Sequence, residues 1–181
     1  MKILKKLFIV IIAIVALILI TALFVQTDFT VMRTVEVAGE KAEVYEYLKF
    51  LENQEEYAVW QKKDPKTVNA SKGTDGTVGF IRTWKSSHEE VGVGEQEITK
   101  LKEGERIDFA LRFKEPMEME STASMTTEAA GDNKTKVTWE FKGSTPYPFN
   151  IMFLFMDMDA ELGPDLKNGL DNLKGIMDSR E

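Results

Sequence analysis

The segment ERIDFALRFK, residues 105–114, alternates apolar and charged side chains over almost its whole length. The apolar residues share one face and the charged residues share the other, as Ile107, Phe109, Leu111 and Phe113 against Arg106, Asp108, Arg112 and Lys114. A period of two residues is that of a β-strand that is buried on one side and solvated on the other. This segment therefore predicts a strand in an antiparallel sheet with one wet face.

Similar patterns lie on both sides of this segment. Further strands are predicted at residues 29–37, 67–71, 77–84, 91–101, 117–128 and 135–143, with hairpin turns at 73–76, 103–104 and 131–134. Besides the residues named above, those predicted to face inward are Phe29, Val31, Val35, Val37, Val78, Phe80, Arg82, Trp84, Met117, Met119, Ser121, Ala123, Met125, Val137, Trp139 and Phe141. Arg33 is the charged exception on the inward face of the first strand.

Two segments have the spacing of amphipathic helices. Residues 40–53, EKAEVYEYLKFLEN, predict a helix of three turns, and the loop that follows is expected to contain a short helical turn with Tyr57 and Trp60. Regularly spaced leucines between residues 162 and 177 predict a long C-terminal helix. Proline is favoured only in a first turn, so we expect Pro164 to mark either the start of this helix at 162–163 or a kink.

The order of these elements resembles a known family. The segments VEVAGEKAEVYEYLKFLEN…YAVW, GTDGTVGFIRTWKS, GVGEQEITKLKEGERIDFALRFKEP, GDNKTKVTWEFKG and GLDNLKGIMD are similar to those of the SRPBCC superfamily of START-like domains, in its polyketide cyclase/dehydrase and lipid transport branch. The resemblance covers residues 30 to about 178, although many members carry tryptophan at the position of Tyr57. It implies an α+β helix-grip fold, in which a curved antiparallel sheet of about seven strands surrounds a long C-terminal helix.

The resemblance also implies a cavity for apolar molecules between the sheet and the terminal helix. The inward residues fit this, because methionine is flexible and polarisable and adapts to apolar guests. The alternative is that the same side chains simply fill a core. The candidate ligand-binding residues are Arg82, Trp84, Gln96, Phe109, Phe113, Met119, Met125, Trp139, Phe141 and Met156.

Other motifs give weaker signals. His88 is the only histidine and lies in a polar loop, without the second nitrogen ligand that zinc spacing requires. The acidic residues at 157–161 differ from a calcium loop and are expected at a helix N-terminus. Gly92 and Gly94 lack the following helix of a phosphate loop and are expected to mark sheet curvature or a close helix approach. We therefore predict no metal and no cofactor.

The N-terminal segment 7–25, LFIVIIAIVALILITALFV, has only one polar residue, Thr21. Nineteen residues of helix span about 28 Å, close to the roughly 30 Å hydrocarbon core of a bilayer. Lys2, Lys5 and Lys6 precede it, which predicts a cytoplasmic N-terminus and an exported domain. We expect an uncleaved anchor over residues 1–27 and one domain over 28–181; the alternatives are a cleaved signal peptide and an inverted or buried hairpin.

Charge and composition exclude several functions. The chain carries −7 and its first 27 residues contribute +3, so the remainder carries −10, which disfavours nucleic-acid partners. The absence of cysteine excludes disulfide and thiolate chemistry.

Three functions are compatible with these patterns. The leading hypothesis is membrane-anchored binding of a hydrophobic small molecule or lipid without chemistry. The second is an enzyme of the cyclase/dehydrase type, for which Arg82, Gln96 and Asp157 are the candidate acid or base groups. The third is a domain that contacts another envelope protein through the apolar segment NIMFLFM at residues 150–156.

Overall fold

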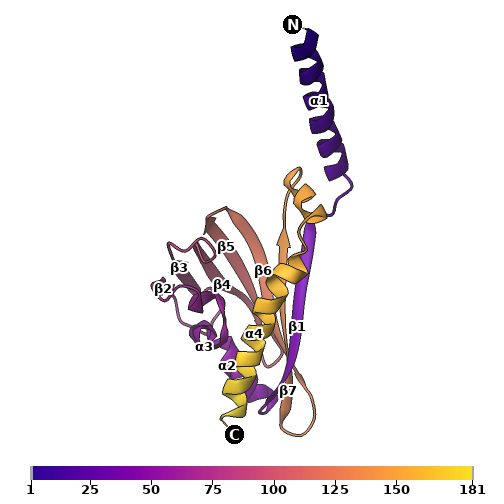
Figure 1. Cartoon of the computed structure of the whole chain (residues 1–181). Helices are drawn as coiled ribbons and strands as arrows, with labels where there is room; N and C mark the ends of the chain where they lie inside the picture. Colours follow the sequence, from indigo (N-terminus) through magenta and orange to yellow (C-terminus); the bar gives the residue numbers. More distant parts are fainter. Residues whose placement is uncertain (1, 181) are drawn as a thin grey trace.

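The computed structural model describes residues 2–180 (Figure 1). The helices are α1 (Lys2–Ala22), α2 (Lys41–Lys49), α3 (Gln54–Tyr57) and α4 (Met158–Asp178), and the 3-10 turns are η1 (Leu51–Asn53), η2 (Trp60–Lys62) and η3 (Phe149–Leu154). The strands are β1 (Asp28–Ala38), β2 (Val68–Lys72), β3 (Ile81–Lys85), β4 (Val93–Lys102), β5 (Arg106–Glu115), β6 (Met119–Ala129) and β7 (Lys134–Ser144). Over residues 2–180 these form one antiparallel sheet of seven strands in the order β1-β7-β6-β5-β4-β3-β2. The predicted α+β architecture is confirmed.

The core lies between one face of this sheet and helix α4. Figure 1 shows α4 running beside β1, with α2 and α3 on the same side of the sheet. α4 packs mainly on β1, and α3 packs on α4. The apolar stripe of α4 is buried as the sequence predicts, through Leu166, Leu170, Leu173 and Met177. The helix therefore covers one side of the sheet and leaves the strands from β3 to β5 to other elements.

The two-residue periods of β1 and β7 are confirmed by their alternating burial, and that of β5 by residues 106–109, whereas residues 110–113 are all half-buried. Two residues predicted to face inward are instead exposed. Val78 is 58% exposed because it precedes β3, in a turn where Gly79 has a φ of 88°. Met117 is 63% exposed because β6 begins only at Met119.

Helix α2 is shorter than the three turns predicted. It ends at Lys49 because Phe50 adopts an extended conformation, with φ −83° and ψ 113°. The Asp75 carboxylate then accepts hydrogen bonds from the backbone N–H groups of Leu51 (2.9 Å) and Glu52 (3.0 Å). This side chain, supplied by a distant turn, starts η1. The helical turn predicted to contain Tyr57 and Trp60 is present as two short elements, α3 with Tyr57 and η2 with Trp60.

Helix α4 begins earlier than predicted. The Asp157 carboxylate caps its N-terminus by accepting hydrogen bonds from Asp159 N–H (2.9 Å) and Ala160 N–H (3.4 Å). The prediction of an acidic helix N-terminus is confirmed, whereas a start at 162–163 is wrong. Pro164 lies inside the helix and has no backbone N–H to donate to the carbonyl of Ala160, four residues earlier. This lost hydrogen bond is tolerated because Ala160 is exposed, so water can bond to its carbonyl.

Arg33, the charged exception on the inward face of β1, fastens α4 to the sheet. Its guanidinium donates to both carboxylate oxygens of Asp159, at 2.7 and 2.9 Å. This hydrogen bonding lowers the pKa of Asp159. A side chain at Gly163 would occupy the space that the guanidinium now fills, so glycine at this position lets Arg33 reach Asp159 in the observed geometry.

The middle of α4 approaches the sheet closely at Gly169. A Cβ atom built there would lie 2.9 Å from Cζ3 of Trp139 on β7. Trp139 is 3% exposed, and its ring packs edge to face against the rings of Tyr57 and Trp60, both at 5.8 Å between centroids. Gly169 therefore sets the distance between helix and sheet.

Gly169→Ala is expected to lower the free energy of unfolding by about 1–2 kcal/mol. Crowding of the new methyl group against Trp139 destabilises the fold by more than the higher helix propensity of alanine stabilises it. Gly175→Ala is the matched control, since nothing lies within 4 Å of a Cβ atom at that position of the same helix. It is expected to raise stability by about 0.5–1 kcal/mol. Thermal unfolding of both variants measures the difference, and equal effects at the two glycines would contradict the close approach.

The N-terminal helix α1 extends away from the domain (Figure 1). Its stretch Ile3–Ala22 is long and apolar enough to cross a membrane, with a mean hydropathy of 3.0. Residues 3–20 of this stretch are all exposed. These properties fit a membrane span or a signal sequence.

Candidate ligand-binding cavity

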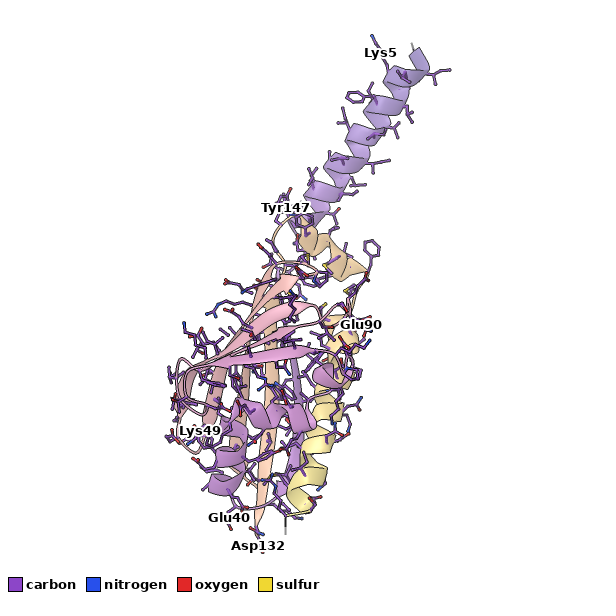
Figure 2. All side chains as sticks on the ribbon, turned by 90° about the vertical axis from the view of Figure 1, so that its left-hand side faces the viewer. Lys5, Glu40, Lys49, Glu90, Asp132 and Tyr147 are labelled. Atoms are coloured by element: carbon purple, nitrogen blue, oxygen red, sulfur yellow. The ribbon has the colours of Figure 1, made fainter. Side chains whose placement is uncertain are left out.

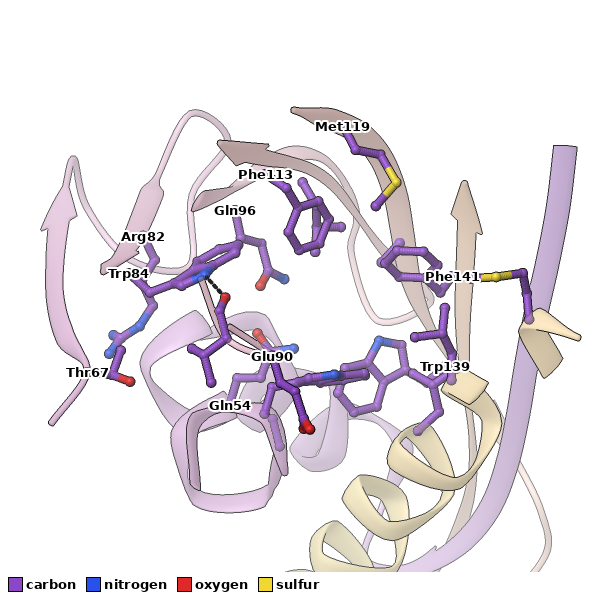
Figure 3. A pocket seen from close by; sticks show the side chains of 18 of the residues that line it. Gln54, Thr67, Arg82, Trp84, Glu90, Gln96, Phe113, Met119, Trp139 and Phe141 are labelled. Carbon is purple, nitrogen blue, oxygen red and sulfur yellow. Dashed lines mark hydrogen bonds between the residues drawn. The ribbon is translucent and has the colours of Figure 1, made fainter. Parts of the chain in front are cut away.

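A cavity of about 270 Å³ lies between the sheet and α4 (Figure 3). Its walls come from β1, β3 to β7, α3, α4 and the loops before β2 and β4. The lining residues are Phe29, Gln54, Ala58, Trp60, Thr67, Arg82, Trp84, Glu90, Val91, Gln96, Leu111, Phe113, Met119, Ala123, Trp139, Phe141, Met158, Leu162 and Leu166. The segment 105–114 contributes the two inward residues nearest its C-terminal end, Leu111 and Phe113.

Aromatic rings form most of the apolar wall. Trp84 meets Phe113 edge to face, with ring centroids 5.7 Å apart, and Trp60 meets Trp139 in the same way at 5.8 Å. The Trp84 indole N–H donates to the carbonyl of Val91 (3.0 Å), another lining residue, so the polar atom of this ring is satisfied by the protein (Figure 3). Edge-to-face pairs keep their geometry better than isolated rings, and the wall is therefore largely preformed.

One end of the cavity is polar. Gln54 is 6% exposed and Gln96 is 8% exposed, and Figure 3 shows both side chains directed into the cavity. Within residues 2–180, neither side-chain amide makes a hydrogen bond to protein. A buried amide without a partner costs about 1–3 kcal/mol. These two groups are available to a guest molecule or to water.

Arg82 lies beside this polar end. Its guanidinium forms an ion pair with Glu55 of α3, while its Nε atom is buried without a hydrogen-bond partner. Desolvation lowers the pKa of Arg82, although Glu52 opposes this shift. Figure 3 shows the guanidinium near Thr67, at the outer side of the cavity. Arg82 therefore contributes positive charge to the edge of the cavity rather than to its centre.

An ion-pair bridge crosses the rim of the cavity. Lys63 Nζ lies 3.3 Å from Glu90 Oε2, in the loop between β3 and β4, and 3.0 Å from Asp165 Oδ2 on α4. The pKa of Lys63 is raised: burial opposes its charge, but its hydrogen bonds to Asp165 and Glu90 outweigh the burial. The bridge holds the β3–β4 loop against α4.

The structure brings seven of the ten predicted ligand-binding residues to the cavity wall: Arg82, Trp84, Gln96, Phe113, Met119, Trp139 and Phe141. Phe109 and Met125 instead belong to the packed core, each 2% exposed. The Tyr57 hydroxyl covers Met125, donating to its sulfur at 3.5 Å. Met156 is 41% exposed and lies in a separate surface groove.

Sequence patterns missed the remaining lining residues. Gln54, Trp60, Glu90 and Val91 come from loops and short turns, whose positions no periodicity specifies. Met158 begins α4, ahead of the leucine spacing at 162–177, so no predicted period gave its inward position. Phe29, Leu111 and Leu162 had inward patterns, but nothing in the sequence separates a cavity wall from a filled core.

The weaker motifs are structural. His88 is exposed in the β3–β4 loop, where its Nδ1 accepts a hydrogen bond from Glu90 N–H (3.3 Å). The expected curvature at Gly92 and Gly94 is confirmed by a register shift between Val93 and Gly94. The expected close helix approach is wrong, because the Trp84 ring and the backbone of β5 occupy the space beside Gly94.

The groups needed for acid or base catalysis are not gathered at the cavity. Asp157 caps α4 and lies in the surface groove that also contains Met156. Of the described lining residues, only Arg82 and Glu90 carry charge, and both are ion-paired. Within residues 2–180, no cluster of three or more His, Asp or Glu side chains is arranged for a metal ion.

The sequence matches no protein-family model and no curated protein. Solved structures do share its fold. A protein of Mesorhizobium loti is 13% identical, with a TM-score of 0.60 over 84% of this chain and 99% of that chain. A protein of Nitrosospira multiformis is 15% identical, with a TM-score of 0.59 over 84% and 100%. Ginseng major latex-like protein 151 from Panax ginseng is 11% identical, with a TM-score of 0.57 over 84% and 99%.

At these identities the comparisons show the fold alone. The chain has the helix-grip fold that the order of its predicted elements implies.

Lys63→Met removes the bridge at the rim and is expected to speed amide hydrogen exchange in residues 86–92 by about two- to fivefold, since partly exposed ion pairs contribute about 0.2–1 kcal/mol. Lys66→Met is the matched control, because Lys66 is exposed and its side chain forms no ion pair with any residue of the described range 2–180. Hydrogen-exchange mass spectrometry measures both variants. Unchanged exchange in this loop after Lys63→Met would show that the bridge does not restrain it.

Proposed function

We propose that this protein binds a hydrophobic small molecule or a single lipid chain in the cavity and does not transform it. The observation that carries this proposal is the pairing of a preformed aromatic and methionine wall with two buried, unpartnered amides at one end. Apolar walls with a few convergent polar groups are the usual construction of ligand pockets. The resemblance to START-like domains supports the same conclusion.

The size and chemistry of the cavity limit the ligand. A volume of about 270 Å³ lies just below the roughly 300–1,000 Å³ typical of ligand pockets. It suits one acyl chain or a compact apolar molecule better than an entire two-chain phospholipid. Gln54 and Gln96 offer both donors and acceptors, so an uncharged hydroxyl or carbonyl at one end of the ligand would be matched.

Membrane anchoring by α1 belongs to the same proposal. The helix is apolar and exposed over residues 3–20, and Lys5 and Lys6 near its start favour a cytoplasmic N-terminus with the domain on the exported side. A domain held at a bilayer meets apolar ligands where they are most concentrated.

The alternative of a cyclase/dehydrase enzyme has less support from the geometry. Such chemistry needs a positioned acid or base within hydrogen-bond reach of the substrate. Glu90 lies at the rim and is held by Lys63, and Arg82 is paired with Glu55. The arrangement favours binding over turnover.

Ala123→Phe is expected to weaken ligand binding by about tenfold or more, because Ala123 lines the cavity and a phenyl ring would occupy it. Displacement of a fluorescent acyl probe from the full chain in nanodiscs measures the affinity. Ala110→Phe makes the same change on the outer face of neighbouring strand β5 and should leave affinity unchanged. Equal affinities in both variants, with both proteins folded, would contradict binding in this cavity.

Gln96→Leu is expected to weaken binding of a fatty alcohol by about two- to tenfold, which is the effect of one lost hydrogen bond. Binding of an alkane of the same length should be unchanged or stronger, because leucine replaces an unpaired amide by apolar surface. Competition of the two ligands against the same probe gives the ratio. A ratio unaffected by the substitution would place the polar end of the ligand elsewhere.

A further inference from the structure

An apolar surface lies where the domain meets α1. We call residues 147–156, which include η3, the η3 segment. Five of its apolar side chains are exposed: Tyr147 46%, Phe149 69%, Leu154 54%, Phe155 87% and Met156 41%. Phe155 is as exposed as Phe24, at 86%, which is the second residue after α1. Large apolar side chains gathered in one exposed patch mark an interaction site.

The η3 segment is fastened to the end of α1. Asn150 is 1% exposed, and its side-chain amide donates to the carbonyls of Ala22 and Val25, both at 2.8 Å. The Ala22 carbonyl at the end of α1 also accepts a hydrogen bond from Val25 N–H (3.4 Å), and Val25 lies in the turn that follows, so Asn150 joins η3 to both the helix end and that turn. The backbone N–H of Thr145 also donates to the Thr27 carbonyl at 2.8 Å. The segment is thereby held level with Val25, the last apolar residue of the N-terminal stretch.

Charge and composition identify the kind of partner. Residues 145–156 contain no charged side chain, so the segment offers no electrostatic complement to a protein or to an anionic headgroup. Tyrosine beside large apolar residues at the end of a membrane span is typical of the interfacial belt. Figure 2 shows Tyr147 next to the domain end of α1, with Asp132 at the opposite end of the domain.

We propose that the η3 segment is a second membrane contact, which inserts Phe149, Leu154 and Phe155 into the leaflet that α1 leaves. This inference rests on the proposed anchoring by α1. Two attachments fix the orientation of the domain, whereas one helix alone would let it rotate. The surface groove beside the segment then faces the bilayer, and Phe29 and Met158 line both that groove and the cavity. The contact thus places the ligand cavity next to lipid.

Site-specific fluorescence quenching tests the contact in the full chain. The sequence has no cysteine, so Phe155→Cys, Asp132→Cys and Ile12→Cys each introduce one thiol for an environment-sensitive label. All three positions are outside the packed core, and the labels should leave folding intact. Each protein is reconstituted in phosphatidylcholine vesicles with or without lipid that carries a nitroxide near the headgroup or in the chain.

The expected result is at least threefold stronger quenching at position 155 than at 132, with strong quenching at position 12. Quenching at 12 but not at 155 would overturn the second contact while leaving the anchor in place, and would assign the patch to a protein partner instead. Absence of quenching at both 12 and 155 would overturn the anchoring and this inference together. Because no ligand is added, failure of ligand binding in the cavity would not alter these outcomes.

Discussion

One helix cannot cover a sheet of seven strands, and the rest of this structure follows from that constraint. Strands spaced about 4.8 Å apart make a seven-stranded sheet roughly 29 Å wide, whereas a helix with its side chains is only about 10–12 Å across. α4 is fixed over β1 and β7, by the Arg33–Asp159 pair and by the close approach of Gly169 to Trp139. The apolar face of β3 to β5 must be covered by something else.

The covering elements are short and irregular. α3, η2 and the β3–β4 loop supply Gln54, Trp60 and Val91, while Trp84 and Phe113 fill part of the remaining space from the sheet. Such elements do not pack as densely as a continuous helix, and the cavity is what they leave. Its polar end combines both kinds of element, because Gln54 comes from the short helix α3 whereas Gln96 comes from β4. The sheet supplies most of the apolar wall together with Arg82 and Gln96, and the short elements close the cavity on its other side.

The parts of this architecture that follow a period could be predicted from the sequence. The alternation in residues 105–114 and 135–143 fixed the inward face of β5 and β7, and the leucine spacing located α4. Arg33 was visible only as an exception, because its partner Asp159 lies 126 residues away. For the start of α4, the acidic residues at 157–161 pointed to the correct end of the helix, whereas Pro164 pointed to a start at 162–163, because the Asp157 cap outweighs the preference of proline for a first turn. Phe109 and Phe113 share one face of one strand, yet only Phe113 meets the cavity, and that difference depends on which elements lie above them.

An apolar guest in the space between the sheet and α4 would contact methionine methyl groups, and their signals therefore report directly on whether this space is occupied. Met119 and Met158 line the cavity, whereas Met125 and Met177 are each 2% exposed in the core. Methyl NMR spectra of the full chain in nanodiscs, labelled at methionine and titrated with dodecanol, distinguish the two pairs. We expect saturable chemical-shift changes at the methyl groups of Met119 and Met158, together with contacts from the alkyl chain of dodecanol to both. The methyl signals of Met125 and Met177 should change little. Unshifted Met119 and Met158 signals, or equal shifts at all four methyl groups, would contradict binding in this space.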